Sequence, residues 1–97
     1  MFKIQGFEWD EDKKRVNKAK HGIDFEEAAT AFGDENHILL PDDKHSEDEG
    51  RFIIIGLSKK TRLLTVCHCY RQNDAIIRII SARKASKTEE EEYGGVP

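Results

Sequence analysis

Long apolar runs, cysteines and prolines are scarce in this chain of 97 residues. No stretch approaches the roughly 20 consecutive apolar residues that cross a membrane, and the first residues lack the apolar segment of a signal peptide. We therefore expect a cytoplasmic protein without membrane contact. The two cysteines, Cys67 and Cys69, are too few and too close for a disulfide framework, so we expect buried thiols.

Several signatures of catalysis and metal binding are also missing. The chain contains no G-x-S-x-G, no glycine-rich phosphate loop, no H-E-x-x-H and no paired-cysteine zinc pattern. His68 lies between the cysteines, but an extended strand points it to the opposite face. The acidic residues between positions 42 and 49 match no calcium loop. We expect neither a metal nor a cofactor.

Apolar residues are also few relative to charged ones. Hydrophobic residues make up 37% of the chain and charged residues 36%, so we expect one domain whose modest core a partner helps to cover. This domain should span residues 1–93. Residues 94–97, which begin with two glycines, should form a flexible tail.

The charge is distributed unevenly along the chain. Residues 1–50 hold seven Lys and Arg against 14 Asp and Glu, whereas residues 51–88 hold nine basic residues and one acid, Asp74. A basic half in a protein of net charge −3 indicates one positive face, which can attract a phosphate backbone. Alternatively, the lysines and arginines protect a solvated sheet edge against aggregation.

The first half of the chain predicts a short strand and two helices. Residues 2–9 carry four apolar side chains and predict a strand. Asp10 is a plausible N-cap and Gly22 a left-handed stop, which predicts a helix over 11–21. Asp24 and Glu27 resemble a capping box for a second helix, which Gly33 ends. Its apolar residues have helical spacing: Phe25, Ala28, Ala29 and Phe32.

The second half predicts strands and a last helix. Segments 36–41, 51–58 and 62–71 have strand patterns, and a further strand begins at Ile76. A helix is expected over 85–93. The fold class is therefore α+β, with an N-terminal helix pair and a C-terminal helix packed on an antiparallel sheet of three or four strands.

Arg78 interrupts four isoleucines in the last predicted strand. A buried guanidinium must be paired with a carboxylate or line a site, because an isolated buried charge is costly. With Arg51, Arg62 and Arg83 it can form one cationic face, which suits phosphate oxygens. Proton-transfer candidates are His21, His45 and Tyr93, with Glu89 as a helper, although a lone histidine is more often structural.

Several short segments, taken in order, resemble the BrnT family of toxins. They span about residues 7 to 93. They are Phe7-Glu8-Trp9-Asp10, Lys13, Asn17, Lys20-His21-Gly22, Phe25-Glu26-Glu27-Ala28, Asp43-Lys44-His45-Ser46, Arg51-Phe52, Gly56, Arg78-Ile79-Ile80-Ser81-Ala82-Arg83-Lys84-Ala85, Glu89 and Tyr93.

The resemblance implies a RelE/ParE-like fold and a ribonuclease toxin of a type II toxin-antitoxin system. Such a toxin cleaves RNA without a metal, inhibits translation and is neutralised by a BrnA-like ribbon-helix-helix antitoxin. Operator DNA is contacted only through the antitoxin complex.

The resemblance implies site roles for Arg78, Arg83 and Tyr93, and also for Lys20, His21 and His45. The remaining RNA-binding candidates, Arg51, Arg62 and Lys84, come from the basic segment and the cationic face. The chain departs from the family in its acidic run, Glu89 to Glu92, where basic residues are expected. Since few general bases accompany the basic segment, the alternative is a non-catalytic binding module or a ParE-like inhibitor of a protein target.

Overall fold

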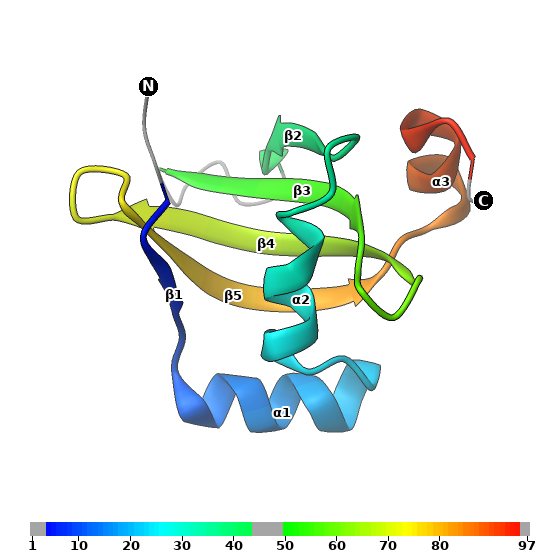
Figure 1. Ribbon diagram of the computed structural model, residues 1–97. Coiled ribbons are helices and arrows are strands. Elements are labelled where there is room, and N and C mark those ends of the chain that lie inside the picture. The colour runs from blue at the N-terminus through cyan, green and yellow to red at the C-terminus, as the bar shows by residue number, and fades with distance from the viewer. Residues whose placement is uncertain (1–3, 44–49, 96–97) are drawn as a thin grey trace.

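The computed structural model describes residues 4–43 and 50–95, which form three helices and a five-stranded mixed sheet (Figure 1). The strand order is β1-β5-β4-β3-β2. The strands are β1 (Gly6–Glu8), β2 (Ile38–Pro41), β3 (Arg51–Leu57), β4 (Leu63–Arg71) and β5 (Ile76–Lys84). None of the helices in these ranges is long and apolar enough to cross a membrane.

The sheet corrects the prediction of three or four antiparallel strands. The meander β3-β4-β5 and the pairing of β2 with β3 are antiparallel, but β1 pairs with β5 in parallel. Only Gly6–Glu8 take part in β1, opposite Ile76 to Arg78. A three-residue strand whose partner lies about 70 positions away carries no local signal of its direction.

Three helices accompany the sheet: α1 (Glu11–His21), α2 (Phe25–Ala31) and α3 (Lys87–Tyr93). The ends of α1 confirm the prediction, because the Asp10 side chain accepts a hydrogen bond from the Lys13 amide and Gly22 has φ of 72°. The capping box predicted for α2 is wrong. The Asp24 side chain makes no cap bond, and its carboxylate instead accepts from Lys18 Nζ at 3.0 Å.

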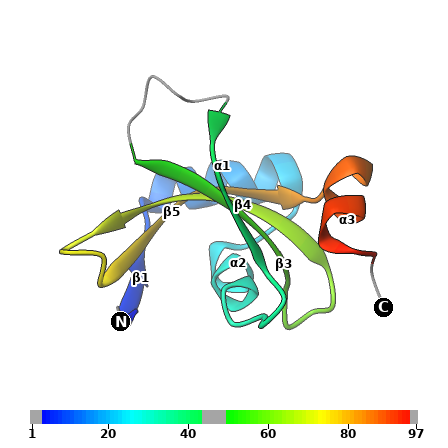
Figure 2. The ribbon, with the colours of Figure 1, turned by 90° about the horizontal axis from the view of Figure 1, so that it is seen from above.

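Helix α2 packs across one face of the sheet, whereas α1 lies along β5 (Figures 1 and 2). The core between α2 and the sheet contains Ile23, Phe25, Ala28, Ala31, Ile54, Leu64, Val66, Ile77, Ile79 and Ala82. Side chains alternate along a strand, so Thr65 and Arg83, which neighbour these core residues, lie on the opposite side. We call this side, which α2 leaves uncovered, the open face.

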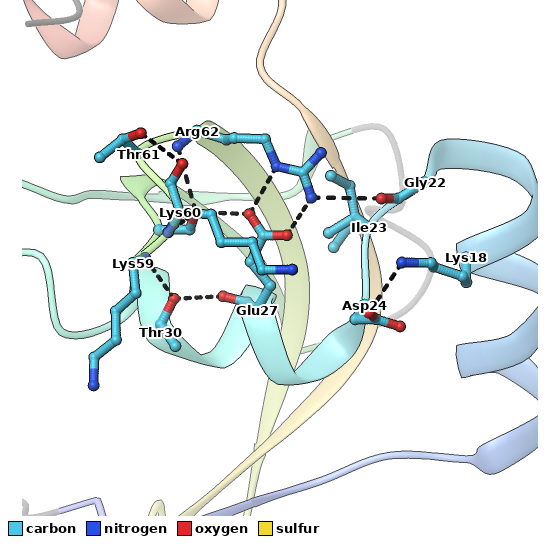
Figure 3. Close-up of polar contacts among 12 residues, drawn as sticks. Lys18, Gly22, Ile23, Asp24, Glu27, Thr30, Lys59, Lys60, Thr61 and Arg62 are labelled. Atoms are coloured by element: carbon cyan, nitrogen blue, oxygen red, sulfur yellow. Dashed lines mark hydrogen bonds and ion pairs between the residues drawn. The ribbon is translucent and has the colours of Figure 1, made fainter.

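Glu27 is the buried carboxylate that ties α2 to the sheet (Figure 3). It accepts two hydrogen bonds from the Arg62 guanidinium and one from Ser58 Oγ, the last at 2.7 Å. The Arg62 guanidinium lowers the pKa of Glu27. Glu27, which was predicted at the N3 position of the capping box, therefore pairs with Arg62 just before β4, because a buried carboxylate without a cation is costly.

His68 and the two cysteines follow the predicted alternation along β4. His68 is fully buried on the α2 side, with its ring 4.8 Å from that of Phe32, and burial lowers its pKa to about 4. Cys67 is buried and Cys69 half-buried, and both thiols are free. The prediction of buried thiols is thus confirmed for Cys67.

Asn17 joins α1 to the edge of β5. Its side-chain amide donates to Ala82 O at 2.9 Å and accepts from Ala82 N at 3.0 Å, as a neighbouring strand would. It also donates to Ile23 O at 3.1 Å. Asn17 is 6% exposed, so water cannot replace these bonds in full.

We expect Asn17→Ala to lower the free energy of unfolding by about 2 to 4 kcal/mol, because several buried backbone groups lose their partners. Urea denaturation measures the change. Arg15→Ala on the exposed side of α1 is the control, with an expected change within about 0.5 kcal/mol. Equal effects in the two variants would contradict this role for Asn17.

Gly56 allows β3 to approach the end of α2. A Cβ at this position would lie 2.7 Å from Ala31 O, whereas one at Gly6 would meet nothing closer than 3.7 Å. We therefore expect Gly56→Ala to lower the melting temperature, at a cost of about 1 to 3 kcal/mol. Gly6→Ala is the matched control, and a larger loss in Gly6→Ala would refute the contact argument.

Candidate functional site

The open face carries a pocket of about 370 Å³ between β2, the middle of the sheet and the start of α3. Its lining combines three apolar side chains with two hydroxyls, a thiol, three carboxylates and one guanidinium. The lining residues are Leu40, Pro41, Asp42, Asp43, Ile53, Thr65, Cys67, Ser81, Arg83 and Glu89.

Arg83 is the cation of this pocket, and Glu89 holds it in place. Nη1 of Arg83 donates to Glu89 Oε1 at 2.7 Å and Nη2 to Oε2 at 3.0 Å. Glu89 also accepts from Thr65 Oγ1 at 2.9 Å and from the Ser86 amide at 2.8 Å. The Arg83 side chain is 40% exposed and that of Glu89 only 16%, so the guanidinium keeps a face toward solvent.

The same contacts explain why an acidic residue, Glu89, stands first in the run from Glu89 to Glu92. Ser86 and Glu89 form a capping box at the start of α3, which orders this short helix. The Arg83 guanidinium, helped by the Ser86 amide and Thr65, lowers the pKa of Glu89 to about 2. Glu89 is therefore a positioning group that is ionised at neutral pH, and through it α3 fixes the orientation of Arg83.

Asp42 and Cys67 line the opposite wall. Cys67 Sγ donates to Asp42 Oδ2 at 3.2 Å, and burial, together with this carboxylate, raises the pKa of the thiol to about 12. A protonated, buried thiol is a poor nucleophile. Cys67 therefore serves as a donor to Asp42, whose negative charge also favours the charged form of Arg83.

Arg51 and Arg78 share the open face with Arg83 but stand outside the pocket. Both pair in register with Cys69, Arg51 from β3 and Arg78 from β5. Arg78 Nη1 donates to Glu8 Oε2 at 2.8 Å, which is the carboxylate pairing expected for an arginine within an apolar strand. Arg78 and Arg83 are five residues apart, about 16 Å along a strand, so they do not form one clamp.

A strand irregularity explains why these two arginines share a face. In a regular strand, positions five apart point to opposite faces. The register between β4 and β5 shifts at Cys67 and His68, where their partners are Ser81 and Ile79. Ile80 is the extra residue, and this bulge returns Arg78 to the open face.

Three predicted residues lie away from the pocket. Arg62 is the partner of buried Glu27 on the α2 side. Lys84 is exposed at the end of β5 and does not line the pocket. Tyr93 donates its hydroxyl to Asp34 Oδ2 at 2.5 Å, and this carboxylate raises the tyrosine pKa to about 12. Tyr93 therefore anchors the end of α3.

Lys20 and His21 line a separate groove between α1 and β5, which Ser81 connects with the pocket because it lines both. His45 lies outside the described residues. Thus the structure places Arg83 in the pocket, puts Arg51 and Arg78 beside it on the same face, and locates Lys20 and His21 next to Ser81.

Sequence reasoning missed five polar residues of the pocket: Asp42, Asp43, Thr65, Cys67 as a donor, and Ser81. A signal was present in part, since polar residues alternate with apolar ones at Thr65, Cys67 and Cys69. Such alternation indicates a side that is not fully covered. Asp42 gave no comparable signal, because it belonged to an acidic stretch interpreted as a solvated loop.

A larger groove of about 550 Å³ lies on the other side, near Phe7, Phe32 and Tyr70. It is mostly apolar, with His37 and Lys59 as its only ionisable groups besides Tyr70. In the described ranges, no three His, Cys, Asp or Glu side chains gather as metal ligands would. The smaller pocket is the one in which a guanidinium is fixed, and a fixed guanidinium suits phosphate oxygens.

Glu89 makes stability depend on acid pH. Its pKa falls from 4.5 to about 2 on folding, so its stabilising contribution is full above pH 4.5 and is lost as the pH falls toward 2. We expect Glu89→Gln to be less stable than wild type at pH 7 and the difference to shrink below pH 4.5. Melting curves between pH 2.5 and 7 measure this, with Glu91→Gln as the exposed control. A difference independent of pH would contradict the ion pair.

Comparisons with known proteins identify a family and a solved structure that this chain resembles. The family described as "Ribonuclease toxin, BrnT, of type II toxin-antitoxin system" matches residues 9–89. A search of curated proteins gave no significant match. The 1.1 Å crystal structure of the Brucella abortus ribonuclease toxin BrnT is similar, with a TM-score of 0.66 and 25% identity, over 84% of this chain and 97% of that chain.

The family match runs from Trp9 at the end of β1 to Glu89 in α3. It therefore includes the Arg83 pocket, the arginines of the open face and the groove beside α1. The chain belongs to the BrnT family of ribonuclease toxins of type II toxin-antitoxin systems.

Proposed function

We propose that this protein is an endoribonuclease toxin that cleaves RNA in the Arg83 pocket without a metal and so inhibits translation. The observation that carries the proposal is the guanidinium of Arg83, fixed by Glu89 in a pocket on the uncovered face of a BrnT chain. The family match supports the ribonuclease activity. The mechanism rests on the chemistry of these side chains.

RNA supplies its own nucleophile. The 2′-oxygen attacks the neighbouring phosphorus, its proton passes to a base, and the 5′-oxygen leaves with a proton from an acid. The products are a 2′,3′-cyclic phosphate and a 5′-hydroxyl. Negative charge grows on the phosphate oxygens in the transition state, and a preorganised guanidinium stabilises it. Arg83 meets this requirement because Glu89 fixes its plane while part of its surface faces the pocket.

Glu89 is unsuited to be the base, because its pKa is about 2 and both of its oxygens already accept from Arg83. We assign proton transfer to His21 and His45, since histidine titrates closest to neutral pH. His21 lies in the groove that meets the pocket at Ser81. His45 follows pocket residue Asp43 by two positions in the sequence.

Arg51 and Arg78 are proposed to bind the phosphates that flank the scissile one. Both lie on the open face, beside Cys69, and a phosphate would compete with Glu8 for Arg78. Tyr93 and Arg62 are left with structural roles by their contacts with Asp34 and Glu27.

The partner is proposed to be a BrnA-like ribbon-helix-helix antitoxin, with operator DNA bound only through the complex, in the cytoplasm. A RelE/ParE-like fold is consistent with helices beside an antiparallel meander. One observation favours the alternative of a ParE-like inhibitor of a protein target: within the described ranges, no histidine lines the Arg83 pocket.

Arg83→Ala should lower kcat for RNA cleavage about 10²- to 10³-fold, because the transition state loses its fixed cation. Antitoxin-free protein is incubated with a labelled RNA in EDTA, and products are tested for a cyclic phosphate. Arg83→Lys should retain part of the activity, since a lysine can still pair with Glu89 but lacks the fork of donors.

Arg15→Ala is the matched control, since it removes the same charge from an exposed position on α1. Melting curves confirm that each variant is folded. Full activity in folded Arg83→Ala would refute the pocket as the active site. Absence of cleavage by the wild type, combined with growth arrest, would favour a protein target.

A further inference from the structure

The groove between α1 and β5 has a chemistry that the catalytic pocket does not explain. It measures about 330 Å³ and is lined by Asp12, Lys13, Val16, Asn17, Lys20, His21, Ile80 and Ser81. Lys13, Val16, Asn17 and Lys20 fall at i, i+3, i+4 and i+7, so they form one stripe along α1. Asn17 binds this stripe to β5.

The cations of α1 divide into two sets. Lys14 pairs with Glu26, Arg15 with Asp12 and Lys18 with Asp24. The other two lysines of the helix, Lys13 and Lys20, have no ion pair within the described ranges. They lie about 10 Å apart along the helix axis, and both line the groove. The positive charge of α1 that its own neighbours do not neutralise is therefore concentrated beside β5.

An apolar surface lies between these two lysines. Val16 is 60% exposed, the highest fraction among the exposed large hydrophobic residues described. Ile80, the extra residue of the bulge, is half-buried across the groove. An apolar strip between two ammonium groups matches a nucleic-acid strand, whose base or ribose packs on the strip while its phosphates meet the cations.

The groove and the Arg83 pocket share one lining residue. Ser81 lines both, and Arg83 lies two residues further along β5. A strand that places one phosphate at Arg83 can therefore extend over Ser81 to α1. A folded protein partner would be expected to cover an apolar patch ringed by charges of both signs. Here Arg15 neutralises Asp12, the one acidic residue of the groove lining, so the remaining charge is positive.

We propose that the groove between α1 and β5 is a second RNA subsite, which binds single-stranded nucleotides next to the scissile phosphate through Lys13, Lys20 and the surface of Val16 and Ile80. This inference rests on the proposed function, since it extends the substrate beyond the Arg83 pocket. It predicts that affinity for RNA depends on length and that α1 contributes to the salt dependence of binding.

The test measures binding of an uncleavable 2′-O-methyl RNA decamer by fluorescence anisotropy at several salt concentrations. Lys13→Gln/Lys20→Gln should raise Kd and reduce the slope of log K against log[salt] by about 1.4, for two phosphate contacts on a single strand. Lys14→Gln/Lys18→Gln is the matched control, with the same charge change on the paired side of the same helix, and its slope should stay close to that of the wild type. Val16→Ser should raise Kd with little change in slope.

Cleavage assays separate this inference from the proposed function. Lys13→Gln/Lys20→Gln should lower kcat/KM for a decamer more than for a dinucleotide, whereas Arg83→Ala should impair both to a similar extent. Equal slopes for the two lysine pairs would overturn the second subsite, even if Arg83 proves catalytic. Unchanged RNA binding with lost antitoxin binding would also overturn it and would identify the groove as a protein interface. If the wild type does not cleave RNA but the salt-dependence slopes of the two lysine-pair variants still differ, the proposed function is refuted and the second subsite is not.

Discussion

The amide of Asn17 is the contact on which the arrangement of the site depends. Beyond the three residues that pair with β1, the outer edge of β5 has no neighbouring strand in the described structure. Asn17 supplies both a donor and an acceptor to Ala82 there and also binds Ile23 O, before the start of α2. One buried side chain thus fixes α1 beside the strand that carries Arg83 and sets the turn into the helix that covers the core.

Some side chains of strand β5 pack in the core, and others face the candidate site. Ile77, Ile79 and Ala82 enter the core, whereas Arg78, Ser81 and Arg83 face the open side. The bulge at Ile80 makes this division possible, because Arg78 and Arg83 would otherwise lie on opposite faces. The acidic residue at the start of α3 completes the site, since Glu89 both caps the helix and orients Arg83.

Local signals predicted the helices well and the sheet less well. Asp10 and Gly22 mark the ends of α1 because capping depends on residues within one turn. The parallel pairing of β1, the bulge, and the pairing of Glu27 with Arg62 depend on partners tens of residues away. Patterns within a short window contain no information about such partners.

The candidate site was predicted only in part, because some of its contacts join residues that are far apart in the sequence. Arg83 was identified from its family resemblance and its place beside an apolar strand, and its pairing with Glu89 lies within six residues. The contributions of Asp42 and Thr65 required the sheet register. A catalytic role for Tyr93 stays a prediction of the resemblance, and the fold directs its hydroxyl to Asp34.

The most direct test of the central claim, that RNA occupies the open face at Arg83, is an NMR titration of the isotope-labelled protein with a 2′-O-methyl RNA oligomer. The account predicts that the backbone amides of Thr65, Ser81 and Arg83 shift in a saturable manner, while those of Phe7 and Tyr70 on the other side stay unchanged. Saturable shifts confined to Phe7 and Tyr70 would contradict it and would move the binding site to the apolar groove on the α2 side.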